Sequence, residues 1–257
     1  MSSAYFTTAD CAALTQWASA DTQLVYEKFL ELHKALHRRF RDYTWDLHPH
    51  SDRNELICNR SSCSAEAIEG LTLRYSRSRD QALTVERAMR DGNRKLDMRL
   101  HPTLELRLTP NHFVVELIVS KEAWYDQQNL VGKLGVARHR QTLRSLIQSF
   151  SPDVCIGFWS GTELDEMHLK AGQVMRGRIF DEWISTFQDG VDDLRIGVWY
   201  DPQDSALDAS QILTELTRRI EMLYKVYTFL SWTSNNDYQT FYEQAASYGS
   251  NRDMRLS

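Results

Sequence analysis

Two seven-residue segments of the chain share one pattern, and their starts lie 40 positions apart. They are residues 153–159 (DVCIGFW) and 193–199 (DLRIGVW). Each segment is apolar, begins at an acidic residue and is followed by apolar residues at helical spacing, so each is predicted to be a short buried strand that leads into a helix. Two such units require a fold in which helices pack on a β-sheet.

The same two segments supply the candidate binding residues. Alternate side chains of a strand point to opposite faces, so Gly157 and Trp159 share one face, as do Arg195, Gly197 and Trp199. A glycine within a strand marks a place where another group approaches the backbone closely. If the strands lie side by side, the glycines form a floor and the tryptophans a wall. These five residues could contact a ligand or partner, or a helix of the same chain could cover them.

The clearest β pattern is a hairpin formed by residues 104–108 and 113–119. Pro110 and Asn111 suit the tight turn between the two strands. The alternation places Leu104, Leu106 and Leu108 on the core face, together with Val115 and Leu117. A further strand is predicted over 71–76, whereas residues 46–70 are predicted to be irregular apart from a short strand near 55–58.

Apolar residues at three- and four-residue steps predict the helices. The predicted ranges are 8–18, 25–43, 80–95, 124–150 with breaks at residues 132 and 135, 179–187, 206–231 and 238–242. The predicted class is α+β, with a mixed β-sheet (the hairpin plus two strand–helix units) packed with helices. A helical crossover predicts that the strands at 153–159 and 193–199 run parallel. Residues 1–50 are predicted to be a helical N-terminal extension and 51–257 an α+β domain, together one compact unit.

The charge distribution narrows the possible partners. The net charge of −5 divides into about +3 over residues 1–150 and −8 over residues 151–257. No apolar run approaches the roughly 20 residues that cross a bilayer. The first residues lack the basic and apolar segments of a signal peptide, and the four cysteines are scattered. We therefore expect a soluble, cytoplasmic protein without a membrane partner.

An arginine-rich stretch over residues 74–107 is the candidate for nucleic-acid contacts. Arg77, Arg79, Arg87 and Arg90 are its candidate phosphate-binding residues, because guanidinium groups bind phosphate well. Five acidic residues lie within the same stretch, so a solvated face with internal ion pairs is the alternative. A net acidic chain disfavours general nucleic-acid binding.

The densest group of potential metal ligands is His48, His50, Cys58 and Cys63. Two imidazoles and two thiolates would satisfy tetrahedral zinc. The four-residue gap between the cysteines is loose for such a site, and ordinary loop residues are the favoured interpretation. We accordingly expect no bound metal or cofactor.

Acidic residues near the two strands provide the candidates for catalysis. Asp153, Glu163, Glu166, His168 and Asp201 could hold a divalent ion and transfer a proton, as in a metal-dependent hydrolase or nuclease. Acidic residues also cap helix N-termini, and all of these acids lie near predicted helix starts. The chain contains no glycine-rich phosphate loop and no Gly-x-Ser-x-Gly elbow.

The sequence therefore favours binding over catalysis. The first hypothesis is a binding protein that contacts another protein or a copy of itself, because catalytic signatures are missing and the C-terminal part is both acidic and aromatic. A metal-dependent hydrolase or nuclease is the alternative, and nucleic-acid binding through residues 74–107 is the third hypothesis.

Overall fold

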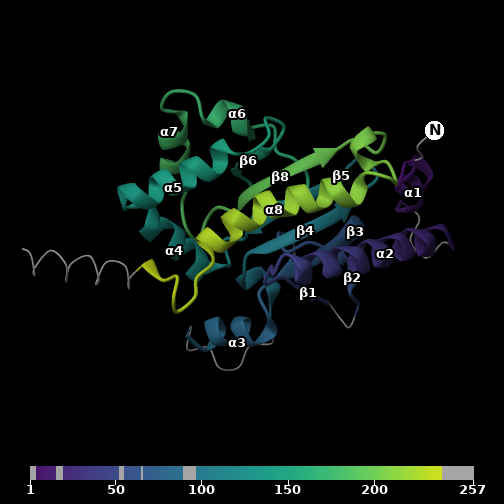
Figure 1. Cartoon of the computed structure of the whole chain (residues 1–257), viewed down its shortest axis with the longest axis horizontal. Helices are drawn as coiled ribbons and strands as arrows, with labels where there is room; N and C mark the ends of the chain where they lie inside the picture. Colours follow the sequence, from purple (N-terminus) through teal and green to yellow (C-terminus); the bar gives the residue numbers. More distant parts are fainter. Residues whose placement is uncertain (1–3, 16–19, 52–54, 65, 89–96, 239–257) are drawn as a thin grey trace, which may run out of the picture.

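The computed structural model describes residues 4–15, 20–51, 55–64, 66–88 and 97–238. Within them, helices pack on an eight-stranded sheet, which confirms the α+β class (Figure 1). The strand order is β1-β3-β4-β5-β8-β6-β7, and β2 also pairs with β3. None of the helices in these ranges is long and apolar enough to span a lipid bilayer.

The strands lie at the centre of the molecule. Their bounds are β1 (His48–His50), β2 (Ile57–Arg60), β3 (Ala67–Ser76), β4 (Thr103–Leu108), β5 (Phe113–Val119), β6 (Cys155–Phe158), β7 (Leu169–Lys170) and β8 (Leu194–Tyr200).

Along the chain, groups of one or two α-helices separate groups of strands. They are α1 (Thr8–Ala13), α2 (Ala20–Asp42), α3 (Arg79–Ala88), α4 (Trp124–Leu134), α5 (Ala137–Gln148), α6 (Ala171–Val174), α7 (Ile179–Ser185) and α8 (Ile212–Leu230). Two short 3-10 turns, η1 (Met98–Leu100) and η2 (Ser205–Leu207), precede β4 and α8.

The hairpin of β4 and β5 is confirmed in the predicted register. Leu104 pairs with Leu117, Leu106 with Val115, and Leu108 with Phe113. The short strand predicted near 55–58 corresponds to β2, but the prediction that the rest of residues 46–70 is irregular is wrong, because β1 and the first part of β3 also lie there. β1 and β2 are short and lack apolar alternation, so pairing with β3 rather than local sequence keeps them extended.

The two similar segments form β6 and β8. These strands lie side by side, which is the arrangement needed to bring their glycines and tryptophans together, but they run antiparallel. Cys155 pairs with Gly197, and Gly157 with Arg195. The parallel orientation predicted from the crossover is wrong because β7 reverses the chain first. β7 and β8 each pair antiparallel with β6, so β7 and β8 run in the same direction. The helical connection through α6 and α7 therefore joins β7 to β8 and not β6 to β8.

Several helix ends differ from the predicted ranges. α4 continues through Gly132, and the break before α5 occurs at Gly135 and Val136 only. α8 begins at Ile212 because η2 occupies the start of the predicted helix. The predicted continuations over 16–18, 89–95 and 239–242 lie outside the described residues.

One face of the sheet carries the main hydrophobic core. Helices α2 and α8 lie across this face (Figure 1), and their apolar residues join those of the strands in one cluster. Phe29 and Leu36 of α2 and Leu223 of α8 are fully buried there, with Leu73 and Leu106 of the sheet. The boundary at residue 50 stays a prediction.

Candidate binding site

The opposite face of the sheet is buried too, but it carries charged side chains. Alternation along β4 turns Glu105 and Arg107 away from the leucine face. The register then aligns Glu105 with Glu116 of β5, and Glu116 with Gly197 of β8. Arg195 lies two residues before Gly197 and shares its face. Glu105, Arg107, Glu116 and Arg195 are each at most 1% exposed, and we call them the buried ion network.

Glu116 links the two arginines of the network. Nη1 of Arg107 lies 2.5 Å from its Oε1, and Nη2 of Arg195 lies 2.5 Å from its Oε2. The Nε group of Arg195 also donates to Oε2 at 3.1 Å. Glu105 supplies the second carboxylate, 3.2 Å from Nη1 of Arg107. Two positive and two negative charges therefore balance within the network.

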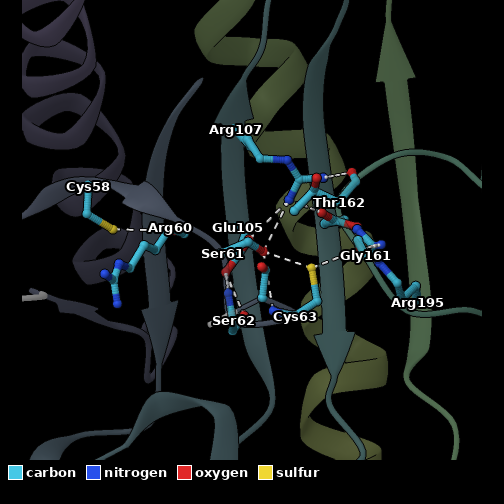
Figure 2. Close-up of polar contacts among 12 residues, drawn as sticks. Cys58, Arg60, Ser61, Ser62, Cys63, Glu105, Arg107, Gly161, Thr162 and Arg195 are labelled. Atoms are coloured by element: carbon cyan, nitrogen blue, oxygen red, sulfur yellow. Dashed lines mark hydrogen bonds and ion pairs between the residues drawn. The ribbon is translucent and has the colours of Figure 1, made fainter. Parts of the chain in front are cut away.

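The network holds a first loop, residues 61–63, against the sheet (Figure 2). The Glu105 carboxylate accepts hydrogen bonds from the Ser61 hydroxyl at 2.6 Å, and from the Ser62 amide at 2.6 Å and its hydroxyl at 2.5 Å. Three donors on one carboxylate satisfy most of its acceptor sites, which offsets part of the cost of its burial. The loop is thus anchored by charge-assisted bonds.

The arginines hold a second loop through its backbone. Nη2 of Arg107 donates to the carbonyl of Thr162 at 2.7 Å, and Nη1 of Arg195 donates to the carbonyl of Gly161. The Cys63 thiol donates to the same Gly161 carbonyl at 3.0 Å, so the two loops also contact each other (Figure 2). Gly161 has φ +92°, a left-handed conformation that favours glycine.

The local electrostatics keep Arg107 charged and the Cys63 thiol neutral. Burial alone would favour neutral Arg107, but Glu116 and Glu105 outweigh it and raise the pKa of the guanidinium. Burial raises the pKa of Cys63 to about 11, although Arg195 acts in the other direction. A thiol with this pKa is a poor nucleophile at neutral pH. The cluster therefore has no activated nucleophile at Cys63.

The five predicted binding residues come together beside the network. The Arg195 guanidinium lies 4.9 Å from the Trp159 ring centroid and 6.0 Å from that of Trp199, within cation–π range. The two rings are 5.8 Å apart. A Cβ atom on Gly197 would lie 2.6 Å from Glu116 Cβ, and one on Gly157 would lie 2.8 Å from the Trp159 ring.

The close approach predicted at both glycines is therefore present. The neighbouring strand β5 makes it at Gly197, and the Trp159 side chain makes it at Gly157, rather than a helix. Arg195 is fully buried and Trp159 is 7% exposed, so neither offers a broad surface to a partner. That these five residues bind a partner stays a prediction.

The second loop presents an outer surface to solvent. In residues 160–168, which we call the acidic loop, the exposed side chains include Glu163, Asp165, Glu166 and Met167. Met167 is 86% exposed, the highest fraction among the exposed large apolar side chains that the structure describes. The Trp159 indole donates to the Glu163 carbonyl at 2.9 Å, which fixes the backbone beneath these side chains.

The candidate catalytic residues have separate environments. Asp153 pairs with Arg219 at 2.5 Å, and His168 contacts the Asp165 carbonyl through Nδ1 at 2.7 Å. The pKa of Asp153 lies below its usual value, because hydrogen bonds and charge from Arg219 outweigh its burial. Glu163 and Glu166 point to solvent on the acidic loop, and Asp201 lines a separate surface hollow with Asp204.

The candidate metal ligands also have other partners. His48 contacts Asp46 at 2.8 Å, and His50 contacts the Arg77 carbonyl at 2.8 Å. Cys58 donates to the Arg60 carbonyl at 3.4 Å, and Cys63 belongs to the loop over the network. Among the residues that the structure describes, no three His, Cys, Asp or Glu side chains form a group that could hold a metal ion.

Among the candidate arginines for nucleic-acid contacts, the three that the structure describes do not form one surface. Arg77 is 4% exposed and pairs with the buried Asp126. Arg79 and Arg87 are exposed on α3, whereas Arg90 lies outside the described residues. Arg77 is therefore unavailable to a phosphate group.

Sequence reasoning identified Arg195 as a candidate binding residue but missed Glu105, Arg107 and Glu116, the other members of the network. Glu105 and Arg107 alternate with leucines in β4, a pattern that equally describes a solvent-facing strand side. Glu116 gives the only available signal, because it interrupts a run of otherwise apolar residues in β5. Ser61 and Ser62 carry no pattern at all.

No model of a known protein family matches the chain, and no curated protein matches it in sequence.

Proposed function

We propose that this protein acts by binding a second protein molecule through the acidic loop, residues 160–168. The observation that carries the proposal is the anchoring of this loop by two fully buried arginines. Arg107 and Arg195 donate to the consecutive carbonyls of Thr162 and Gly161. Loops that a rigid scaffold positions are common sites of binding.

The energetics of burial support a positioning role. Removing charged groups from water costs several kcal/mol per ion, and apolar residues of similar size would often stabilise a fold as well or better. Leucines in place of the network would consequently give the fold about the same stability. What leucines could not supply are the directional hydrogen bonds to the two loops. Those bonds lower the conformational entropy that the acidic loop would lose on binding.

The charge of the acidic loop favours a partner with a basic surface. Glu163, Asp165 and Glu166 give it three carboxylates around the exposed Met167. The chain itself offers a matching surface on α5, whose sequence ARHRQTLRSLIQ contains three arginines and no acid. A second copy of the chain is therefore the partner of choice.

Two arginines of α5 would supply the basic contact. Arg138 and Arg140 are exposed, and neither forms an ion pair with an acid in the described part of the chain. Arg144 is partly occupied, since it lies 3.3 Å from Asp181. Opposite charges at the rim of an interface would steer association and make it sensitive to salt.

A charge-swap experiment tests the proposal. Sedimentation equilibrium of the parent protein should show self-association that weakens as salt rises. Glu163→Lys/Glu166→Lys should abolish it, and so should Arg138→Glu/Arg140→Glu, because each places like charges in contact. Mixing the two variants should restore association. The matched control is Glu221→Lys, a reversal at an exposed position of α8.

Two results would count against the proposal. Self-association that the Glu163→Lys/Glu166→Lys variant retains would place the contact elsewhere on the surface. A parent protein that stays monomeric at every concentration would reject a second copy as the partner, and the same variant would then serve as the control in a search for a basic protein partner.

A further inference from the structure

A cavity of about 380 Å³ lies far along the chain from the acidic loop, between α3, α8 and the turn that follows α8. Its volume falls in the range typical of small-molecule sites. Val85 of α3, Tyr224 and Tyr227 of α8, and Trp232 of the turn provide apolar walls. Asp46 also lines it.

Buried polar residues hold one wall of this cavity in place. The Asp126 carboxylate accepts from the Trp232 amide at 2.6 Å, and Arg77 Nη1 donates to the Trp232 carbonyl at 3.0 Å. Asn129 donates to the Leu230 carbonyl at 3.0 Å, and Lys133 donates to the Phe229 carbonyl at 2.5 Å. The Trp232 backbone is thus fixed on both its amide and its carbonyl, which presets the cavity for a ligand.

The aromatic residues give the cavity a preference for positive charge. Tyr224, Tyr227 and Trp232 offer three π-systems, and the faces of such rings attract cations. The rings of Tyr224 and Tyr227 are stacked on each other with centroids 5.9 Å apart, and both residues belong to the lining. The Tyr224 hydroxyl accepts from the Asp46 amide at 2.9 Å, which ties the acid to this wall.

Asp46 adds a negative charge at the same place. Burial would raise its pKa, but hydrogen bonds from Gln81 and His48 outweigh burial and lower it, so the group is a carboxylate at neutral pH. Gln81 Nε2 donates to Oδ2 at 2.6 Å and His48 lies 2.8 Å from Oδ1. These two contacts fix the orientation of the Asp46 carboxylate.

Arg77 is the cation in the lining, and its charge is compensated. Its Nη2 pairs with Asp126, which is fully buried, and its Nη1 is bound to the Trp232 carbonyl. The guanidinium is only 4% exposed. Asp46 is consequently the charged group of the lining that no arginine or lysine among the described residues compensates.

From three aromatic rings, one oriented carboxylate and a preset wall, we infer that this cavity binds a small organic cation, such as an alkylated ammonium group on a short apolar or hydroxylated chain. The ammonium would lie against Trp232 and Tyr224 with Asp46 as its counter-ion. This site is independent of the acidic loop and of self-association.

A pair of equal-shaped probes tests the inference. Choline and its uncharged isostere 3,3-dimethylbutan-1-ol are titrated into the full chain, with binding followed by calorimetry and by tryptophan fluorescence. Choline should bind at least about tenfold more tightly than the alcohol, because only the cation gains from the rings and the carboxylate. Equal affinities, or no binding of choline at millimolar concentrations, would overturn the inference.

Three variants locate the binding. Trp232→Leu and Asp46→Asn should each weaken choline binding at least about fivefold. Asp46→Asn should leave the weak binding of the uncharged alcohol nearly unchanged, because the alcohol has no charge to pair with the carboxylate. Trp124→Leu, which alters an exposed tryptophan on α4, should not change it. If Asp46→Asn or Trp232→Leu loses stability, Tyr224→Leu gives the remaining test, since it removes one of the aromatic rings and must weaken choline binding. Loss of binding in Trp124→Leu, or its retention in folded Trp232→Leu, would reject this cavity.

Discussion

The two faces of the sheet are both buried, but one carries apolar side chains and the other carries charged side chains. On one face, leucines of β4 and β5 pack against α2 and α8. On the other, Glu105, Arg107, Glu116 and Arg195 bind one another and two loops. Adjacent residues of the same strands, such as Leu106 and Arg107, therefore belong to different kinds of interior.

The difference separates two tasks of the fold. Apolar contacts are non-directional and stabilise in proportion to the area they bury, so the helix-covered face supplies stability. Charged hydrogen bonds are directional, and their net contribution after desolvation is small, so the loop-covered face supplies position. Replacement of single residues on the two faces should show this contrast.

The largest effect is expected at Glu116, the centre of the network. Glu116→Ala leaves Arg107 and Arg195 buried without their shared carboxylate, and breaking a buried ion pair in this way costs about 3–5 kcal/mol of unfolding free energy. Leu106→Ala on the other face should cost about 2–5 kcal/mol through lost apolar burial and a cavity. Urea denaturation followed by circular dichroism measures both.

The comparison becomes sharper when the charges are removed together. Glu116→Met/Arg195→Met should lose less stability than Glu116→Ala, because one of the two stranded charges is gone and apolar volume replaces it. A double variant less stable than Glu116→Ala would mean that the network contributes net stability, and the contrast between the faces would then fail.

A smaller effect is expected at the two glycines of the polar face. A Cβ at position 197 would meet the Val115 carbonyl at 2.7 Å and Glu116 Cα at 2.9 Å, which are backbone atoms that cannot move easily. At position 157 the nearest group is the Trp159 side chain. Gly197→Val should thus cost more than Gly157→Val, within the usual range of about 1–3 kcal/mol for overpacking. Thermal melts of both variants test the order, and unchanged melting of both would refute the close approach.

The apolar face could be predicted from sequence because its rules are local. Leucines at alternate positions 104, 106 and 108, with a turn after them, determine the hairpin and its register. The orientation of β6 and β8 could not be predicted in the same way. It depends on β7, a two-residue strand that carries no periodic signal of its own.

The polar face could be predicted only in part. Glycine and tryptophan occupy matching positions in the segments that form β6 and β8, so the sequence predicts that these four residues share one face of the sheet. The partners of the buried Arg107, Ser61 and Thr162, come from irregular segments, and Thr162 contributes only a backbone carbonyl. A carbonyl is common to every residue, and no sequence pattern can indicate which one a buried arginine will contact.

The smallest effect concerns the loops that cover the polar face. Cys63 lies in the first loop, and its pKa of about 11 leaves little thiolate, so alkylation by iodoacetamide at pH 8 should be slow. Arg107→Lys removes the hydrogen bond to the Thr162 carbonyl while keeping a positive charge near Glu105 and Glu116. Labelling of Cys63 in this variant, followed by mass spectrometry of its peptide, should become several-fold faster because the loops open locally. The control is Leu106→Ala, which lowers the stability of the whole fold but changes no residue of the two loops. Suppose that Leu106→Ala accelerates labelling as much as Arg107→Lys does. Cys63 then becomes accessible through global unfolding, and the two faces of the sheet do not have the separate roles that their side chains suggest.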